Sequence, residues 1–327
     1  FPEHAALSPE YARVAGEHIA GADVVVFTHP WCFPALAHLL RPEQLVVHDS
    51  QNVETLLKTE ALDHLPGAGP LLRLVAESEQ AVIQRSQLVL ACSQEDVAMY
   101  TRVFDLSPAK LRVAPNGAFT ERFAGAEDLD RITPRAGLGL PADKPVAIFL
   151  GSLYGPNVEA ARYIATQLAP ACPDVYFVIA GGVGQALADL PRRANLLVTG
   201  TVDEAVRDGL LLAADVALNP MDAGSGTNVK MFDYMAAALP VLCTEIGARG
   251  IGTLAASPEG VVVAPLQDFP SRLPQLLAAL KANPALRRCV RDTVCARFSW
   301  ERISAELGRL LRRAHARHRR GRSHGRI

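Results

Sequence analysis

The chain has 327 residues, of which 49% are hydrophobic and 20% charged, and its formal net charge at pH 7 is −1. This composition supplies a sizeable core and excludes wholesale disorder, and the length predicts two domains at about 150 residues each. No apolar run reaches the roughly 18 residues that a transmembrane helix needs.

Six cysteines are scattered along the chain without a Cys-x-x-Cys pair. This pattern argues against a disulfide framework and a zinc site, and it fits a reducing compartment.

The basic residues gather near the C-terminus. From Arg309 to Ile327 there are eight Arg, three His and no acid, so the rest of the chain holds 25 basic and 34 acidic side chains and carries −9. Such an acidic body disfavours nucleic acid as a partner, because binding phosphates needs a basic face. Two interpretations of the tail stay open: contact with an anionic membrane surface, or a solvated, disordered terminus.

Short apolar, β-branched runs alternate with longer amphipathic stretches, which is typical of parallel strands covered by helices on both faces. The predicted strands are 23–28, 44–48, 88–91, 111–114, 146–150, 175–180, 196–198, 216–218, 241–243 and 260–263. The predicted helices include 1–20, 157–168, 204–213, 230–238, 269–282 and 300–314. The sequence therefore predicts an α/β fold of two Rossmann-like, doubly wound domains that face a cleft.

A Gly/Pro/Asp-rich stretch with weak periodicity, 120–144, predicts a linker between the domains. We expect an N-terminal domain over 1–135, a C-terminal domain over 136–310 and a basic tail over 311–327. Ligands of doubly wound domains bind at the carboxyl ends of the strands, so we look for the site there.

The strongest chemical signal follows the strand 216–218. A Gly-rich loop, Gly224–Asn228, opens a helix, whose free N–H groups and dipole favour an anion. Lys230, in the first turn, adds a charge for a phosphate, and Asp233 follows three residues later on the same helix face. A cation beside a carboxylate suits a nucleotide, with diphosphate at Lys230 and ribose or sugar hydroxyls at Asp233. The other interpretation is an ordinary surface helix with an ion pair between these two residues.

Weaker signals follow other strands. Gly151 ends the strand 146–150 and lets a ligand approach the backbone, while Asn157 is predicted to cap the next helix. The run 181–184 lacks the third glycine of a dinucleotide-binding motif, so a tight turn is the favoured interpretation. The Asp128-Leu129-Asp130 triplet lies in the polar linker and is read as solvated acids.

Taken together, these motifs resemble the GT-B glycosyltransferases of the family-4 type, in the branch with a Gly-Ser-Gly-Thr loop. The resemblance runs from about Asp23 to Trp300. In the C-terminal half it rests on Gly151-Ser152, 157–161, Gly200-Thr201-Val202, the loop and helix 223–241, Thr244 and Gly247-Ala248-Arg249-Gly250. In the N-terminal half it rests on Asp49, Asn52-Val53-Glu54, Ser93-Gln94-Glu95-Asp96 and Pro115-Asn116-Gly117.

The resemblance implies a hexosyl-type transferase that moves a sugar from a nucleotide-sugar donor, bound by the C-terminal domain, to a glycan or lipid-linked acceptor. It implies retention at the anomeric carbon and neither a metal nor another cofactor. The donor-binding residues that it indicates are Gly151, Ser152, Asn157, Val202, Gly224, Ser225, Gly226, Thr227 and Asn228. It gives Lys230 and Asp233 catalytic roles, at the diphosphate and at the ribose hydroxyls.

One departure from the family concerns acids. The family often carries two acids on this loop and helix, and here those places hold Ser225 and Asp233. Asp233 has a shorter side chain than the family's acid but still suits ribose hydroxyls. Because Ser225 stands where the family has its other acid, the contacts to the hydroxyls of the donor sugar are left open.

In the N-terminal half, His48 is the candidate catalytic histidine, placed to contact the donor sugar or orient the acceptor. His29 and Gln51 compete for this role, because the family's histidine is replaced by Gln51 here. The alternative for His48 is a structural residue at a strand end. Glu54 is either an acceptor-side acid or an acid that stabilises a helix start.

Nothing before Asp23 supplies the strand and Gly-rich loop with which such enzymes begin, so we expect an incomplete N-terminal domain. This leaves a non-catalytic nucleotide-sugar-binding protein or an inactive fragment as the alternative function. A sugar-nucleotide epimerase of the same fold is a third possibility, disfavoured by the Lys230 and Asp233 pattern. We expect a cytoplasmic location, with the tail available to the inner membrane face.

Overall fold

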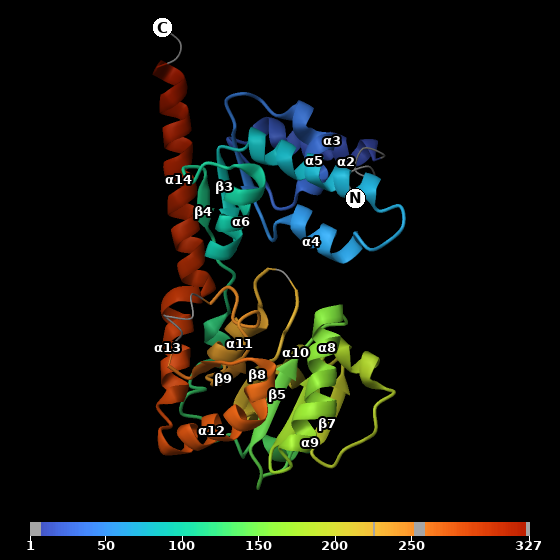
Figure 1. Cartoon of the computed structure of the whole chain (residues 1–327). Helices are drawn as coiled ribbons and strands as arrows, with labels where there is room; N and C mark the ends of the chain where they lie inside the picture. Colours follow the sequence, from blue (N-terminus) through green and yellow to red (C-terminus); the bar gives the residue numbers. More distant parts are fainter. Residues whose placement is uncertain (1–7, 225, 252–258, 325–327) are drawn as a thin grey trace. The chain divides into compact units, whose positions relative to one another are not determined.

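The computed structural model describes residues 8–224, 226–251 and 259–324, with side chains up to residue 321. The chain forms two compact units. Unit 1 comprises residues 1–115, 225–227 and 303–327, and unit 2 comprises residues 116–224 and 228–302. Figure 1 labels the elements of both.

Unit 1 is built on a parallel sheet in the order β1-β2-β3-β4. Its strands are β1 (Val24–Phe27), β2 (Leu45–Asp49), β3 (Leu88–Ala91) and β4 (Leu111–Val113). Its helices are α2 (Pro9–Gly21), α3 (Phe33–Leu36), α4 (Glu54–Leu62), α5 (Gly69–Arg85), α6 (Gln94–Phe104) and most of α14 (Trp300–His324).

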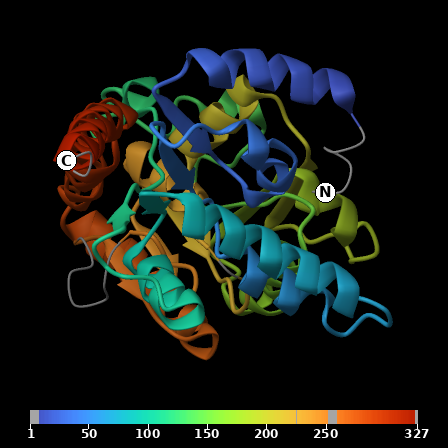
Figure 2. The ribbon, with the colours of Figure 1, turned by 90° about the horizontal axis from the view of Figure 1, so that it is seen from above.

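Both faces of this sheet are covered. Helices α2, α3, α5 and α6 pack on one face, where Val46 and Val89 join the core. The other face presents Leu45, Val47, Leu88 and Leu90 to apolar side chains of α14, namely Leu307, Leu310, Leu311 and Ala314. Figure 2 views α14 nearly along its axis, on the other side of the β1–β2 strands from α5.

Unit 2 contains a parallel sheet in the order β10-β9-β8-β5-β6-β7. Its strands are β5 (Val146–Leu150), β6 (Tyr176–Ala180), β7 (Leu196–Gly200), β8 (Val216–Asn219), β9 (Val241–Cys243) and β10 (Val261–Val263). Its α-helices are α7 (Arg135–Leu138), α8 (Gly155–Tyr163), α9 (Ala169–Ala171), α10 (Glu204–Ala213), α11 (Lys230–Ala236), α12 (Phe269–Ala282) and α13 (Leu286–Phe298).

The sheet of unit 2 is doubly wound. Helices α10, α11 and α13 cover one face, and α8, α9 and α12 cover the other, so the inner strands β5, β6, β8 and β9 are buried on both sides, whereas the edge strand β7 is not. All ten predicted strands are present, and the α/β fold with two Rossmann-like units is confirmed. The helix predicted over 300–314 is longer, because α14 continues to His324, so the described part of the tail is helical rather than disordered, although its arginines are exposed.

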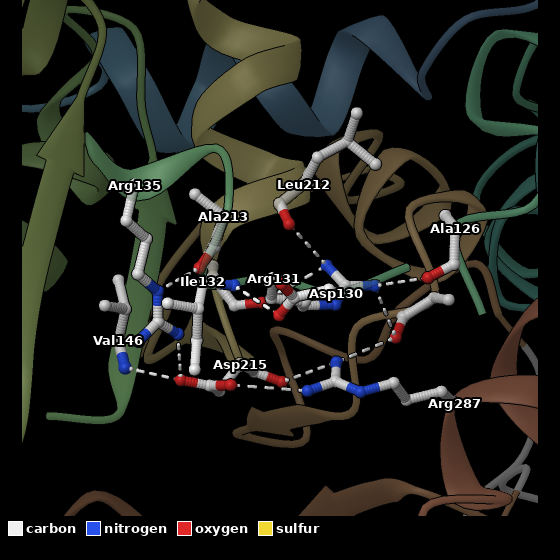
Figure 3. Close-up of polar contacts among 12 residues, drawn as sticks. Ala126, Asp130, Arg131, Ile132, Arg135, Val146, Leu212, Ala213, Asp215 and Arg287 are labelled. Carbon is white, nitrogen blue, oxygen red and sulfur yellow. Dashed lines mark hydrogen bonds and ion pairs between the residues drawn. The ribbon is translucent and has the colours of Figure 1, made fainter. Parts of the chain in front are cut away.

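The stretch 120–144 differs from the predicted linker, because two of its arginines are buried in unit 2 (Figure 3). Arg131 donates hydrogen bonds to the carbonyls of Leu211, Ala214 and Ala237, among others, at the ends of α10 and α11. Arg135 donates to the Asp215 carboxylate at 2.6 Å. These guanidinium groups satisfy helix C-terminal carbonyls that would otherwise be buried without donors. The stretch therefore helps to hold α11 in place, the helix that begins at Lys230.

The acids of the Asp128-Leu129-Asp130 triplet are exposed, as the sequence predicts, and Asp128 pairs with Arg288 on the surface.

Candidate functional site

The predicted donor-site segments lie at one edge of the unit 2 sheet. Leu150 pairs with Ala180, Ala180 with Gly200, and Asn219 with Cys243, so these strands end at the same edge. The chain leaves β5 towards β6 and leaves β8 in the opposite direction, towards β9. The neighbouring ends of β5 and β8 therefore form the kind of topological switch point at which doubly wound domains bind ligands.

Lys230 is the first residue of α11, and its ammonium group points into this edge. Its Nζ donates a hydrogen bond to Asn157 Oδ1 at 2.7 Å and lies 4.3 Å from the centre of the Phe149 ring. None of the ion pairs among the described residues involves Lys230, and burial lowers its pKa to about 7. A buried ammonium group held only by neutral groups is prepared for an anion, because an added negative charge would offset its desolvation.

Asn157 connects this lysine to the end of β5. It does not cap α8 as predicted, because the helix starts at Gly155 and Asn157 lies inside its first turn. Its amide donates to the carbonyl and hydroxyl oxygens of Ser152 at 3.3 and 3.1 Å. Asn157 therefore fixes both the lysine and the turn after β5.

Gly151 is required for packing at this turn. A Cβ atom there would lie 3.0 Å from the Phe149 ring and 3.1 Å from Val183, and its N–H already donates to the Ala180 carbonyl. Next to it, a Cβ on Gly181 would lie 2.3 Å from the Gly151 oxygen. Gly151 thus shapes the site, and its N–H is already bonded within the sheet, while its role in donor binding stays a prediction.

The loop before α11 uses glycines for its backbone conformation. Gly224 and Gly226 have φ angles of 110° and 78°, in the left-handed region that favours glycine. Ser225 lies outside the described residues. The Thr227 hydroxyl is buried and has no hydrogen-bond partner among the described residues.

Asn228 anchors a second loop. Its amide donates to the Ile246 carbonyl at 2.7 Å, and its backbone N–H donates to the Arg249 carbonyl at 3.3 Å. The structure shows this anchoring contact for Asn228, and its predicted contact with the donor stays a prediction.

The second loop brings in Arg249, for which the sequence suggested no role. Its Nη1 donates to the Gly224 carbonyl at 2.7 Å. The signal that could have identified it was the run Gly247-Ala248-Arg249-Gly250, which places a cation among small residues after a buried strand.

Asp233 lies one turn along α11 and has other neighbours than Lys230. Burial raises the pKa of its carboxyl group, and the charges of Arg207 and Arg122 oppose this shift. Among the described residues no ion pair joins Asp233 to Lys230, so the interpretation as a surface helix with such a pair is not supported. Val202, half-buried, follows β7 at the same sheet edge and precedes Asp203, which caps α10.

In unit 1, His48 is buried within β2 and is 1% exposed. Its Nδ1 lies 3.0 Å from the Phe27 carbonyl, and burial lowers its pKa to about 4. The ring has no access to a substrate in this conformation, which favours the structural role over the catalytic one.

His29, the competing histidine, is half-exposed and lies near Glu54 at the start of α4, with Nδ1 and Oε1 3.7 Å apart. Glu54 is almost fully buried, and Lys58 approaches it at 3.6 Å. Gln51 is half-buried in the same β2–α4 connection. His29, Glu54 and Lys58 are therefore among the polar groups near the carboxyl end of this sheet, whereas the His48 ring lies in the core.

Over the part of the chain that the structure describes, no group of three or more His, Cys, Asp or Glu side chains could hold a metal ion. In the same ranges, no helix combines the length and the apolarity needed to cross a bilayer.

Comparisons with known proteins place the segments of the site within a known family. Residues 144–280, which include β5 to β10, α11 and both loops of the site, match the family described as glycosyl transferases group 1.

Relatives in sequence are the D-inositol 3-phosphate glycosyltransferases of Mycobacterium tuberculosis and Mycobacterium bovis. Each is 28% identical to this chain over 322 residues. The alignment covers 92% of this chain but 64% of the relative, so the chain spans just under two thirds of their length.

Two solved structures have a similar fold. HepE of Anabaena, in complex with UDP and glucose, gives a TM-score of 0.72 at 15% identity and covers 93% of this chain and 82% of its own. Sucrose-phosphate synthase of Thermosynechococcus elongatus gives 0.69 at 20% identity, with coverages of 94% and 78%. The chain therefore has the fold of the GT-B glycosyltransferases, and its residues 144–280 match the glycosyl transferases group 1 family.

Proposed function

We propose that the protein is a glycosyltransferase of the family-4 type, in the Gly-Ser-Gly-Thr branch, which transfers a sugar from a nucleotide-sugar donor to a hydroxyl of an acceptor with retention at the anomeric carbon. Donor binding is assigned to unit 2, which begins at residue 116 rather than at the predicted residue 136, and acceptor binding to unit 1. The acceptor is a glycan or a lipid-linked sugar, and the enzyme works in the cytoplasm.

The observation that carries the proposal is the environment of Lys230. Its ammonium group is turned into the edge formed by the ends of β5 and β8, is bonded to Asn157, and has no carboxylate partner among the described residues. A lysine on an ordinary surface helix would extend into water. A diphosphate placed here would gain a charge-assisted hydrogen bond, which is stronger than a neutral one.

The proposed reaction breaks the bond between the anomeric carbon and the diphosphate oxygen and forms a bond from that carbon to the acceptor oxygen. The proton of the acceptor hydroxyl passes to the departing phosphate oxygen. Negative charge grows on the diphosphate as the bond breaks, so Lys230 stabilises the transition state more than the ground state. Asp233 accepts hydrogen bonds from ribose hydroxyls, and its partly buried carboxylate suits that role.

The comparisons support a nucleotide-sugar donor. HepE, of similar fold, was solved with UDP and glucose and with UDP-glucose, and the family match spans the strands and loops that carry Lys230. The D-inositol 3-phosphate glycosyltransferases are named for the transfer of a sugar to a hydroxyl compound, in line with the reaction class proposed here.

We further propose that the basic end of α14 contacts an anionic membrane surface. Arg309, Arg312, Arg313 and Arg317 are exposed, and residues 309–321 contain no acid. Each such residue near an anionic surface contributes about 1 kcal/mol. This contact would bring the enzyme to a lipid-linked acceptor.

A thermal-shift screen of UDP-, GDP- and ADP-sugars tests the donor, because a ligand selective for the native state raises the melting temperature. Calorimetry then compares Lys230→Ala with the exposed Lys281→Ala on α12. We expect Lys230→Ala to weaken nucleoside diphosphate binding about 10- to 100-fold, since a charged hydrogen bond contributes about 1.5–3 kcal/mol, and Lys281→Ala to leave it unchanged.

Unchanged affinity of Lys230→Ala would remove the assignment. Donor binding without transfer to any acceptor and without donor hydrolysis would favour a non-catalytic sugar-nucleotide-binding protein.

A further inference from the structure

The candidate donor site has a second cation besides Lys230. Arg249 lies in the loop after β9, and its Nη1 donates to the carbonyl of Gly224, the first residue of the Gly-rich loop, at 2.7 Å. It is half-buried, and no ion pair of the described residues includes it. A guanidinium group has five N–H donors, and among the described residues Arg249 uses one of them, for Gly224, which leaves the others for a further acceptor.

The loop that carries Arg249 is firmly anchored. Thr244 donates its hydroxyl to the Met221 carbonyl and accepts the Gly247 N–H at 2.9 Å. Asn219, fully buried at the end of β8, donates to the Gly247 carbonyl at 2.7 Å, and a Cβ on Gly247 would lie 2.3 Å from the Asn219 oxygen. Asn228 adds its bond to Ile246. These bonds fix the position of the loop and therefore of the Arg249 side chain. A preorganised anion site requires its charged groups to be held in place in this way.

The hydrogen-bond acceptors of the two cations lie close together in the fold. Gly224, which accepts the Arg249 hydrogen bond, has Pro156 within 3.6 Å and the Tyr154 hydroxyl within 3.8 Å of an added Cβ. Lys230 bonds Asn157, the residue after Pro156. The loop after β9 and the start of α11 are therefore each tied, through one cation, to the region around the start of α8.

A diphosphate carries more charge than one lysine compensates. On the basis of the proposed function, we propose that Arg249 is a second diphosphate-binding residue, which shares the phosphate oxygens of the donor with Lys230. The planar guanidinium holds two oxygens of a phosphate in a fixed geometry, while the lysine acts as a point charge. The bond to Gly224 sets the orientation of Arg249 before the ligand arrives.

Two substitutions separate a cationic role from one that only positions the loop. Arg249→Gln keeps a neutral N–H donor for the Gly224 carbonyl but removes the charge. Arg249→Lys keeps the charge but loses the planar fork. The exposed Arg272→Gln on α12 is the matched control. The full-length variants are titrated calorimetrically with inorganic pyrophosphate and with the nucleoside diphosphate selected by the thermal-shift screen, at two salt concentrations.

We expect Arg249→Gln to bind both ligands about 10- to 100-fold more weakly than wild type, with a weaker salt dependence, and Arg249→Lys to recover part of the loss. Arg272→Gln should match wild type. Wild-type affinity in Arg249→Gln, or equal losses in Arg249→Gln and Arg249→Lys with unchanged salt dependence, would overturn the cationic role.

The two ligands also distinguish this inference from the function on which it rests. Binding of pyrophosphate that depends on Arg249, without any binding of nucleoside diphosphates or their sugars, would support the inference and refute the proposed function. Nucleoside diphosphate binding that is unchanged by Arg249→Gln would support the proposed function and refute the inference. A wild-type protein that binds neither ligand would refute both.

Discussion

Lys230 shows how the surroundings of one side chain set its proton affinity. Burial lowers the pKa of its ammonium group to about 7, from an ordinary value of 10.5. A lysine in bulk water would stay charged throughout the physiological range, whereas this one titrates inside it. A bound diphosphate opposes the shift, because its negative charge favours the protonated form.

Donor binding should therefore depend on pH. Above pH 7 the free protein increasingly loses the Lys230 proton, and binding must restore it, so affinity falls as pH rises, by up to about tenfold per unit. Calorimetry of nucleoside diphosphate binding at pH 6.5–9, in buffers of different ionisation enthalpy, measures both the affinity and the proton uptake. Lys230→Met should bind weakly with no proton uptake. Proton uptake that persists in Lys230→Met would assign the titration to another group.

For single residues, the sequence predicts the position of a side chain within a helix or loop better than it predicts the partners of that side chain. The placement of Lys230 at the first position of a helix follows from the Gly-rich loop before it and is confirmed. The capping role of Asn157 is wrong, because Pro156 permits the helix to begin at Gly155. The partners of Asn228 and Arg249 lie on segments distant along the chain, and a local pattern carries no information about such contacts.

Helices α10 and α11 depend on a residue that belongs to neither. Arg131 is buried and donates to carbonyls near the C-terminal ends of both helices, and beside it Arg287 bonds the Asp215 carboxylate (Figure 3). Burial and the nearby Arg287 lower the Arg131 pKa to about 9, so the group still carries its charge at neutral pH. It matches the negative ends of two helix dipoles.

Arg131→Met should destabilise unit 2 by about 3–5 kcal/mol, because it leaves several buried carbonyls without donors. The exposed Arg192→Met is the control and should change stability by less than about 0.5 kcal/mol. Urea unfolding gives the free energies, and hydrogen exchange at the C-terminal ends of α10 and α11 should accelerate in Arg131→Met alone. Equal midpoints for the two variants would show that water replaces the lost donors.

Helices and strands were predicted well where composition and hydrophobic periodicity indicate the same kind of element. Strands β3, β5 and β9 begin and end at the predicted residues, because continuous β-branched and apolar runs mark strands buried on both faces. The prediction that 120–144 is a linker was incomplete. The Gly, Pro and Asp content of this stretch indicates loop structure correctly, but the burial of Arg131 and Arg135 depends on helix ends some 80 residues later.

Viewed as a whole molecule, the chain ends in a long helix with two distinct sides. Toward unit 1, Leu307, Leu310 and Leu311 pack against the sheet. Residues 309–321 also carry arginines that are exposed to solvent. The sequence alone predicts the basic character of this end, and the packed leucines explain why it is helical rather than disordered.

Binding to anionic vesicles tests the proposed membrane contact. The triple substitution Arg312→Gln, Arg313→Gln and Arg317→Gln should weaken binding to phosphatidylserine-containing vesicles by about 100-fold, from about 1 kcal/mol per residue. Arg192→Gln with Arg272→Gln removes exposed charge elsewhere and should have little effect. Sedimentation with the vesicles measures binding, and high salt should abolish it. Equal binding to neutral vesicles would contradict an electrostatic contact.

The packing of α14 on unit 1 has a consequence for how the chain is made. Leu45, Val47, Leu88 and Leu90 precede the leucines of α14 that cover them by 217 to 266 residues. At about 5–20 residues per second, this face of the sheet is uncovered for on the order of 10–50 s during synthesis. The sheet of unit 1 can therefore bury its second face only after α14 has been synthesised.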